Sequence, residues 1–249
     1  MTIPRGKKFL GVASQARIQF QDASADLRSF HAIRQMLKER KRANRHINKV
    51  SKGVHVLIAA TWEAYCEDLA LESARFLVEN VADWEQLPRP LARRIAKELR
   101  EDKHELSPWK LAGEGWRTHV LENLSSAPLF NVPKAEKIDD LFLRAIGITS
   151  ISESWVDPDD GVDLRARLRH HVELRGAIAH GTPPETEVTP AVVSEFYQTV
   201  MLLAQQTDEA VRAFLESSIG FTPWEKEGLT PAAVDVLSED QESTPDAYT

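Results

Sequence analysis

The sequence predicts an all-α protein: a bundle of several helices with an extra basic helix at the amino-terminal end and an acidic carboxy-terminal tail. Apolar residues recur at intervals of three and four in one segment after another, which is the helical period. Glycine is scarce, with 11 in 249 residues, while Ala, Leu, Glu and Arg are abundant. No segment has the pattern of a strand. The length suits one domain with appendages.

The first expected helix covers residues 14–48 and ends in a basic run, Lys38–Lys52. Residues 1–52 hold thirteen Lys and Arg against three Asp and Glu, whereas the remaining residues hold eighteen against thirty-five. This asymmetry is typical of a nucleic-acid-binding arm, and equally of a solvated helix that docks on its own acidic body. We treat residues 1–50 as a basic helical extension. Its candidate nucleic-acid contacts are Arg40, Lys41, Arg42, Arg45 and Lys49.

The second expected helix, at about 51–81, is the most apolar element of the chain. Only a narrow arc is polar, and it contains Glu63 and Glu67, one turn apart. A helix that is apolar nearly all round belongs in the middle of a bundle.

Shorter elements follow, and each has a recognisable start or stop. Asp157-Pro-Asp-Asp-Gly161 predicts a loop over 148–163, and Gly181 followed by Pro183 and Pro184 predicts the end of the helix before it. Thr189 is the expected cap of the last long helix, with Pro190 in its first turn. The expected helices are 90–103, 107–124, 134–147, 162–180, 189–218 and a short one within 219–237, followed by a disordered acidic tail at 238–249.

Several classes of protein are excluded by what the sequence lacks. The single cysteine, Cys66, rules out an internal disulfide framework and a multi-cysteine zinc site. His104-Glu105 and His170-His171 lack the partners that a metal site needs, and no phosphate-binding glycine loop is found. We therefore expect no metal, no cofactor and no membrane span, and a cytoplasmic location.

The most informative segment is the helix end that contains Arg175, His180 and Gly181. Arginine holds a phosphate as a two-pronged donor, and histidine transfers protons near neutral pH. Together they can cleave RNA without a metal. The spacing alone is weak evidence for such a site, because Arg165 and His170 are separated by the same number of residues.

Helix geometry places Arg175 and His180 roughly 140° apart, so they do not share a face. Arg175 lies near the centre of the apolar arc, where an unpaired charge is costly; a carboxylate such as Glu63 or Glu67, or a phosphate, must compensate it. His180 lies on the other arc with Arg169 and Glu173. One chain therefore offers a half-site, and two copies about a two-fold axis would complete it. The alternative is structural: Arg175 forms an ion pair and His180 caps the helix.

At these residues the chain resembles the HEPN superfamily, and most closely its RiboL-PSP-type domains. Arg175-Gly-Ala-Ile-Ala-His180-Gly181 is similar to the family motif of an Arg, four to six residues and a His near the end of a late helix, and Glu173 fits it as well. Ile58–Leu69 is similar to an early helix of these domains. The resemblance covers about 50–218 and makes 51–218 the expected HEPN-like domain.

The resemblance implies an all-α, usually dimeric bundle and a metal-independent endoribonuclease. Such proteins are often part of toxin–antitoxin or anti-phage defence systems, so an antitoxin or defence protein is an expected partner. The implied catalytic residues are Arg175, His180 and Glu173, and Arg169 joins the candidate RNA contacts. One departure is Gly176, where the family commonly has Asn. It leaves open a non-catalytic dimer that binds a partner protein, or an RNA binder without cleavage.

Overall fold

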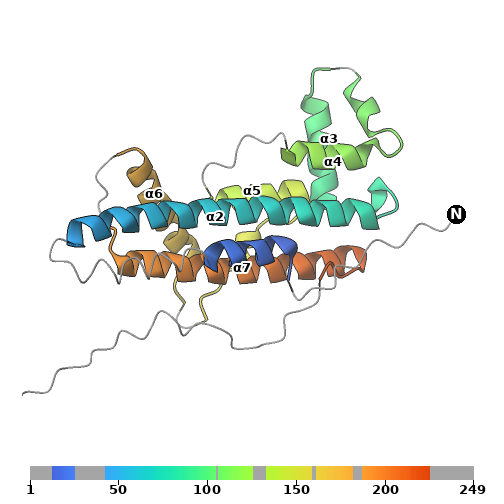
Figure 1. Cartoon of the computed structure of the whole chain (residues 1–249). Coiled ribbons are helices and arrows are strands. Elements are labelled where there is room, and N and C mark those ends of the chain that lie inside the picture. The colour runs from blue at the N-terminus through green and yellow to red at the C-terminus, as the bar shows by residue number, and fades with distance from the viewer. Residues whose placement is uncertain are drawn as a thin grey trace, which may run out of the picture.

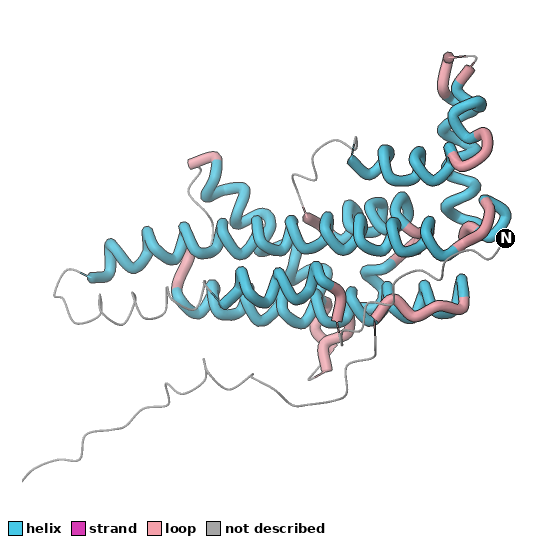
Figure 2. The backbone as a smooth tube through the Cα atoms, turned by 45° about the vertical axis from the view of Figure 1, so that its right-hand side comes forward, coloured by secondary structure: helices cyan, strands magenta, loops and turns pink. Residues whose placement is uncertain are grey.

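The computed structural model describes residues 13–25, 43–104, 106–125, 133–158, 161–181 and 187–224. Over these ranges every regular element is helical and no strand occurs. The predicted all-α fold class is therefore confirmed. The molecule is an elongated bundle in which two long helices lie side by side (Figures 1 and 2).

The two long helices, α2 (Ala43–Asn80) and α7 (Pro190–Ile219), run parallel to each other. Near their first turns, Asn48 Nδ2 donates a hydrogen bond to Glu187 Oε1 over 2.7 Å. Further along, the Tyr65 hydroxyl donates to the carbonyl of Ala204 over 2.8 Å. The helix expected to start at residue 51 thus begins earlier, at Ala43.

The core is built around aromatic side chains on the inner face of α2. Trp62 is fully buried and stacks on Tyr65 with a centroid distance of 5.4 Å. Phe20, from the helix of residues 15–25, lies 5.1 Å from Tyr65, and Trp155 meets Trp62 edge-on at 6.3 Å. Each such side chain stabilises the fold by about 1.5–3 kcal/mol through burial. The core therefore joins the amino-terminal helix, α2 and the segment that contains Trp155.

The helix of residues 15–25 is held at its amino-terminal end by carboxylates from both long helices. Glu72 of α2 accepts hydrogen bonds from the backbone N–H groups of Gln15 and Ala16, at 3.0 and 2.9 Å. Asp208 of α7 accepts from the Ser14 hydroxyl and backbone N–H. Carboxylates there also complement the helix dipole. The described part of the expected extension is thus docked on acidic residues of the bundle.

Shorter elements surround the long pair. In Figure 1, α3 and α4 lie at one end of α2, α6 at the other, and α5 between them. Contacts link α2 with α4, α5 and α6. The elements are η1 (Trp84–Gln86), α3 (Arg89–Glu101), η2 (Ser107–Leu111), α4 (Gly115–Ser125), α5 (Ala135–Ala145), η3 (Ile151–Ser154) and α6 (Leu164–Ala179).

The helix predicted at 107–124 is divided in two. Gly113 has a φ of 60°, which breaks the helical path after η2. A Cβ at Gly115 would lie 2.0 Å from the carbonyl oxygen of Lys110, so only glycine allows the tight turn into α4.

The loop predicted at 148–163 contains a short buried helix, η3. The backbone N–H and hydroxyl of Ser152 both donate to the Asp139 carboxylate, at 2.8 and 2.9 Å. The indole N–H of Trp155 donates to the Thr207 hydroxyl over 2.9 Å. Contacts distant in sequence therefore order a segment whose own composition is typical of a loop. The last described residue is 224, so most of the range 219–237, in which a short helix was predicted, and the whole tail at 238–249 lie outside the described residues.

Candidate functional site

The candidate site lies on α6, whose two ends follow from local sequence. At the start, the Asp163 carboxylate accepts hydrogen bonds from the backbone N–H groups of Arg165 and Ala166, at 2.9 and 3.2 Å. At the end, the His180 N–H donates to the Gly176 carbonyl, and Gly181 takes a φ of 69°. The predicted stop at Gly181 is confirmed. His180 is therefore the cap residue of the helix.

A pair of buried histidines fixes α6 against the bundle. His55 Nε2 of α2 and His171 Nδ1 of α6 lie 3.3 Å apart, and both side chains are fully buried. Both rings pack on Phe196 of α7, at centroid distances of 4.6 and 4.4 Å. The pair therefore joins three helices one turn before Arg175.

Burial sets the protonation state of this pair. It lowers the pKa of His55 to about 4 and that of His171 to about 3, and neighbouring histidines add to both shifts. Both imidazoles are neutral near pH 7. In either tautomer one ring N–H has no partner, because His55 Nδ1 and His171 Nε2 make no hydrogen bond within the described chain. This contact was not predicted from the sequence. The signal that could have indicated it is His55, a histidine on the apolar face of α2.

Arg175 is half-buried and lies within electrostatic range of Glu63. Burial raises the pKa of the Glu63 carboxyl, Glu67 raises it further, and the Arg175 guanidinium lowers it. Of the residues that the structure describes, none forms a hydrogen bond or an ion pair within 4.0 Å with Arg175. Glu63 thus supplies a nearby negative charge, and the guanidinium retains its hydrogen-bond donors.

His180 is exposed at the end of α6 and does not meet Arg175 in the single chain. Over the described ranges no hydrogen bond links the two side chains. An ideal helix separates the two positions by roughly 140° about its axis, so we expect one copy to present the two groups on different sides of the same helix end.

The other two site residues on α6 pair with the start of α5. Glu173 accepts a hydrogen bond from Lys134 Nζ over 3.2 Å, and Arg169 donates to Glu136 over 3.0 Å. Glu173 was expected on the same arc of the helix as His180, and in the structure its carboxylate pairs with Lys134. Both pairs are exposed, so each can open at little cost when a charged ligand competes.

The basic candidates of the amino-terminal extension are only partly covered by the structure. Lys49 is exposed on α2. Arg45 belongs to α2, but its side chain lies outside the described part. Arg40, Lys41 and Arg42 also lie outside the described residues.

Gly176 lies in the interior of α6 with open space beside it. A Cβ built there meets no described atom within 4 Å. Glycine costs about 1 kcal/mol in a helix interior and is therefore typical of a close approach by another backbone or a ligand, and the described part of the chain supplies neither. Among the described residues, none therefore fills the space beside Gly176.

One face of α2 is exposed, contrary to the prediction that this helix is covered on all sides. Gly53, Leu57, Ala60 and Ala64 are all exposed and follow each other at intervals of four, three and four, so they form one stripe. Leu57 keeps 44% of its surface exposed. The other elements of the bundle pack on the opposite faces. We call these four residues the α2 stripe.

Over the described ranges, no group of three or more His, Cys, Asp or Glu residues is arranged to hold a metal ion. No described helix is both long and apolar enough to cross a membrane.

A family model described as RiboL-PSP-HEPN matches residues 19–213. Neither the curated proteins nor the solved structures gave a match. The family match starts earlier than residue 50, where the resemblance was expected to begin, and it includes most of the docked amino-terminal helix. Because it covers well over half of the 249 residues, the chain belongs to the RiboL-PSP-HEPN family.

Proposed function

We propose that this protein is a metal-independent endoribonuclease whose active site is formed by Arg175 and His180 from two copies of the chain. The observation that carries the proposal is the state of Arg175: half-buried within electrostatic range of Glu63, yet without a hydrogen bond or ion pair to any described residue. Arginine in such a position is prepared to bind an anion. Membership of the RiboL-PSP-HEPN family makes RNA the natural anion to test.

The chemistry that these groups support is cleavage by the ribose 2′-hydroxyl. One His180 accepts the proton of the 2′-OH, and the 2′-oxygen attacks phosphorus. The bond from phosphorus to the 5′-oxygen then breaks, and a second imidazole protonates that oxygen. Arg175 stabilises the negative charge that develops on the phosphoryl oxygens. The products are a 2′,3′-cyclic phosphate and a 5′-hydroxyl.

Two copies are needed because the reaction uses two proton-transfer groups and one chain offers a single His180 at this helix end. The α2 stripe supports such a pairing: its small and apolar side chains are exposed in one row, and Gly176 leaves open space on α6. An isologous contact about a two-fold axis would cover both features. Arg169 would then contact RNA phosphates, and Glu173 would orient His180 or help to bind RNA. Their ion pairs with Glu136 and Lys134 are exposed and can open at little cost.

A second function is favoured by Gly176, which stands where the family commonly has Asn. In that case the protein is a helical dimer that binds a partner protein, or binds RNA without cutting it. RNA binding alone would depend strongly on salt and give no product.

Expression in a bacterial host tests the proposal in cells. Wild type is expected to slow growth and degrade RNA, whereas His180→Ala is harmless. His170→Ala is the matched control, because His170 is also exposed on α6 and follows Arg165 at the same spacing. Equal toxicity of wild type and His180→Ala would overturn the mechanism. A role in a toxin–antitoxin or defence system predicts that a co-encoded partner suppresses the toxicity.

A further inference from the structure

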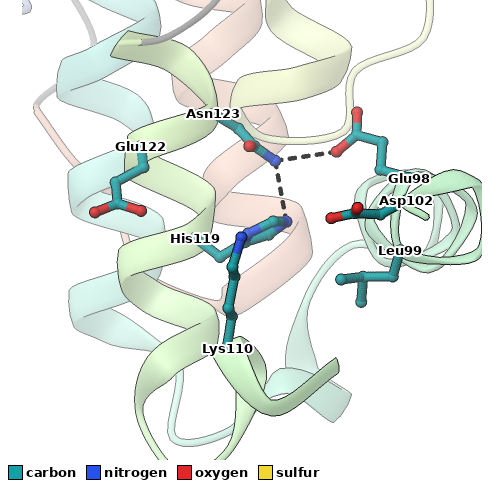
Figure 3. Close-up of a pocket in the computed structure, with 7 residues that line it drawn as sticks. All are labelled: Glu98, Leu99, Asp102, Lys110, His119, Glu122 and Asn123. Atoms are coloured by element: carbon teal, nitrogen blue, oxygen red, sulfur yellow. Dashed lines mark hydrogen bonds between the residues drawn. The ribbon is translucent and has the colours of Figure 1, made fainter. Parts of the chain in front are cut away.

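Helix α3 carries its acidic and its basic side chains on different faces. Leu91 and Ile95 mark the buried face, with 1% and 6% of their surfaces exposed. On that side Glu98 and Asp102 line a pocket that α3 forms with η2 and α4 (Figure 3). The opposite face is basic, since four cationic residues lie within an arc of about 80°. We call them the α3 stripe: Arg89, Arg93, Lys97 and Arg100.

The described part of the chain does not neutralise the α3 stripe. All four side chains are exposed, and Arg89 and Arg93 form no hydrogen bond or ion pair with a described residue. Lys97 lies 3.8 Å from Glu101, but both side chains are 67% exposed, and such a pair contributes little. Arg100 donates to a backbone carbonyl one turn earlier, so its charge also remains unpaired.

The α3 stripe is unfavourable for the helix that carries it. Arg89 is the first residue of α3, where the helix dipole disfavours a positive charge. Arg89 and Arg93, and then Arg93 and Lys97, are like-charge neighbours at i, i+4 and repel each other. Arg94, on another side of the same helix, is instead paired with carboxylates of α3 and α5. The structure therefore gives Arg94 a structural role and gives the α3 stripe none.

The ligand that complements the α3 stripe is an extended anion. The four cations follow each other over about 16 Å of the helix axis. A membrane surface does not suit them, because an amphipathic helix binds a bilayer through its apolar face, and that face of α3 is buried. Trp84 of η1, five residues before Arg89, keeps 59% of its surface exposed. An exposed indole close to a row of cations is suited to stack on the bases of a single strand.

We propose that the α3 stripe binds the phosphate backbone of single-stranded RNA. The choice of RNA rests on the proposed function and on membership of the RiboL-PSP-HEPN family. Each cation contacts a phosphate and releases counterions from the strand. Because α3 and α6 lie at different ends of α2, the α3 stripe holds a part of the strand away from the Arg175–His180 centre (Figure 1). The substrate is therefore a long RNA and not a short oligonucleotide.

Fluorescence anisotropy with a labelled single-stranded RNA of about 30 nucleotides, measured at several salt concentrations, tests the proposal. The full chain is used with His180→Ala as the parent, so that the RNA stays intact. Arg93→Gln and Lys97→Gln should each weaken binding about threefold or more. Each should also reduce the slope of log affinity against log salt by about 0.7. Arg75→Gln removes an exposed cation from α2, is the matched control and should leave both quantities unchanged.

Thermal unfolding checks that the variants are folded. Arg93→Gln should be at least as stable as the parent, because it removes two repulsive contacts. If it unfolds, Lys97→Gln decides the outcome. The proposal is overturned if both variants bind RNA as the parent does, or if Arg75→Gln weakens binding equally. It is also overturned if the two variants lose binding only to vesicles of phosphatidylcholine and phosphatidylserine, or only to polyglutamate.

The result can be separated from that of the proposed function. If wild type cleaves RNA while the two variants bind it like the parent, the α3 stripe fails and the proposed function stands. If the two variants lose RNA binding while wild type cleaves no RNA, the α3 stripe stands and the proposed function fails.

Discussion

At the residue scale, Arg175 combines two properties that rarely occur together. Its side chain is half-buried, and among the described residues it has no hydrogen-bond or ion-pair partner within 4.0 Å. A structural arginine in a core normally pairs with a carboxylate, as Arg212 does with Glu209 and Glu216 on α7. Arg175 has only the longer-range influence of Glu63. This difference is the one we expect between a ligand-binding arginine and a structural one.

We therefore predict that Arg175→Ala changes the free energy of unfolding by less than about 1 kcal/mol while it abolishes RNA cleavage. Urea unfolding and a cleavage assay on the same preparations check both parts. Arg212→Ala breaks two charge-assisted contacts and serves as the comparison. It should lower the free energy of unfolding by more than Arg175→Ala does. A loss of several kcal/mol for Arg175→Ala, with cleavage retained, would show that the residue is structural.

Gly176 and Gly181 give opposite predictions although they are five residues apart. Gly176 has ordinary helical surroundings and open space, so Gly176→Ala should stabilise the monomer by about 0.5–1 kcal/mol. Gly181 has a φ of 69°, so Gly181→Ala should destabilise it by about 1 kcal/mol. Thermal unfolding at low protein concentration measures both. If Gly176→Ala instead destabilises the monomer, the space beside it is not open.

At the element scale, α6 is held by the His55–His171 pair, and this contact makes the fold acid-sensitive. The pKa of each histidine is below 6.5 in the folded chain, about 4 for His55 and about 3 for His171. The stability that the pair contributes is therefore complete above pH 6.5. It is lost as the pH falls below 6.5 toward those values, because the unfolded chain binds protons first.

Between pH 6 and pH 4, each histidine is predicted to lower the free energy of unfolding by up to about 1.4 kcal/mol for every pH unit by which the pH falls. Asp208 acts in the opposite sense, since burial raises its pKa to about 6 and its protonation favours the folded state as the pH falls. Comparison of wild type with His171→Phe isolates the pair, because Asp208 is common to both. Unfolding free energies measured from pH 7 to pH 4 should fall less steeply for His171→Phe. Equal slopes would contradict the assignment.

Elements with local end signals could be predicted from the sequence. Thr189 and Pro190 marked the start of α7, and Gly181 marked the end of α6. Contacts between residues far apart in the sequence could not be predicted. His55 and His171 are 116 positions apart, and η3 depends on contacts with Asp139 and Thr207. The exposed α2 stripe was mistaken for core because an apolar face looks the same in sequence whether this chain or another molecule covers it.

At the scale of the whole molecule, the parallel α2–α7 pair separates two regions. Towards one end lies α6, which carries Arg175 and is capped by His180, and at the other end lie α3 and α4 (Figure 1). The α2 stripe lies on the helix that links these ends. We expect it to be the contact between two copies, because a half-site on α6 needs a second chain.

A charge placed in the stripe should prevent that contact. Ala60→Glu is expected to shift a dimer to a monomer in light scattering and to lower cleavage about tenfold or more, because burying the added carboxylate is costly. Ala96→Glu, at an exposed position of α3, is the matched control for the oligomeric state and should leave the dimer intact. A monomeric wild type that cleaves RNA would refute the two-copy site.

The most direct test of the central claim is analysis of the RNA ends produced by the purified protein in the presence of EDTA. Wild type and His170→Ala should leave 2′,3′-cyclic phosphate and 5′-hydroxyl ends, and Arg175→Ala and His180→Ala should leave the RNA intact. Cleavage by His180→Ala at the wild-type rate, or 3′-hydroxyl ends formed only with a divalent metal, would contradict the claim.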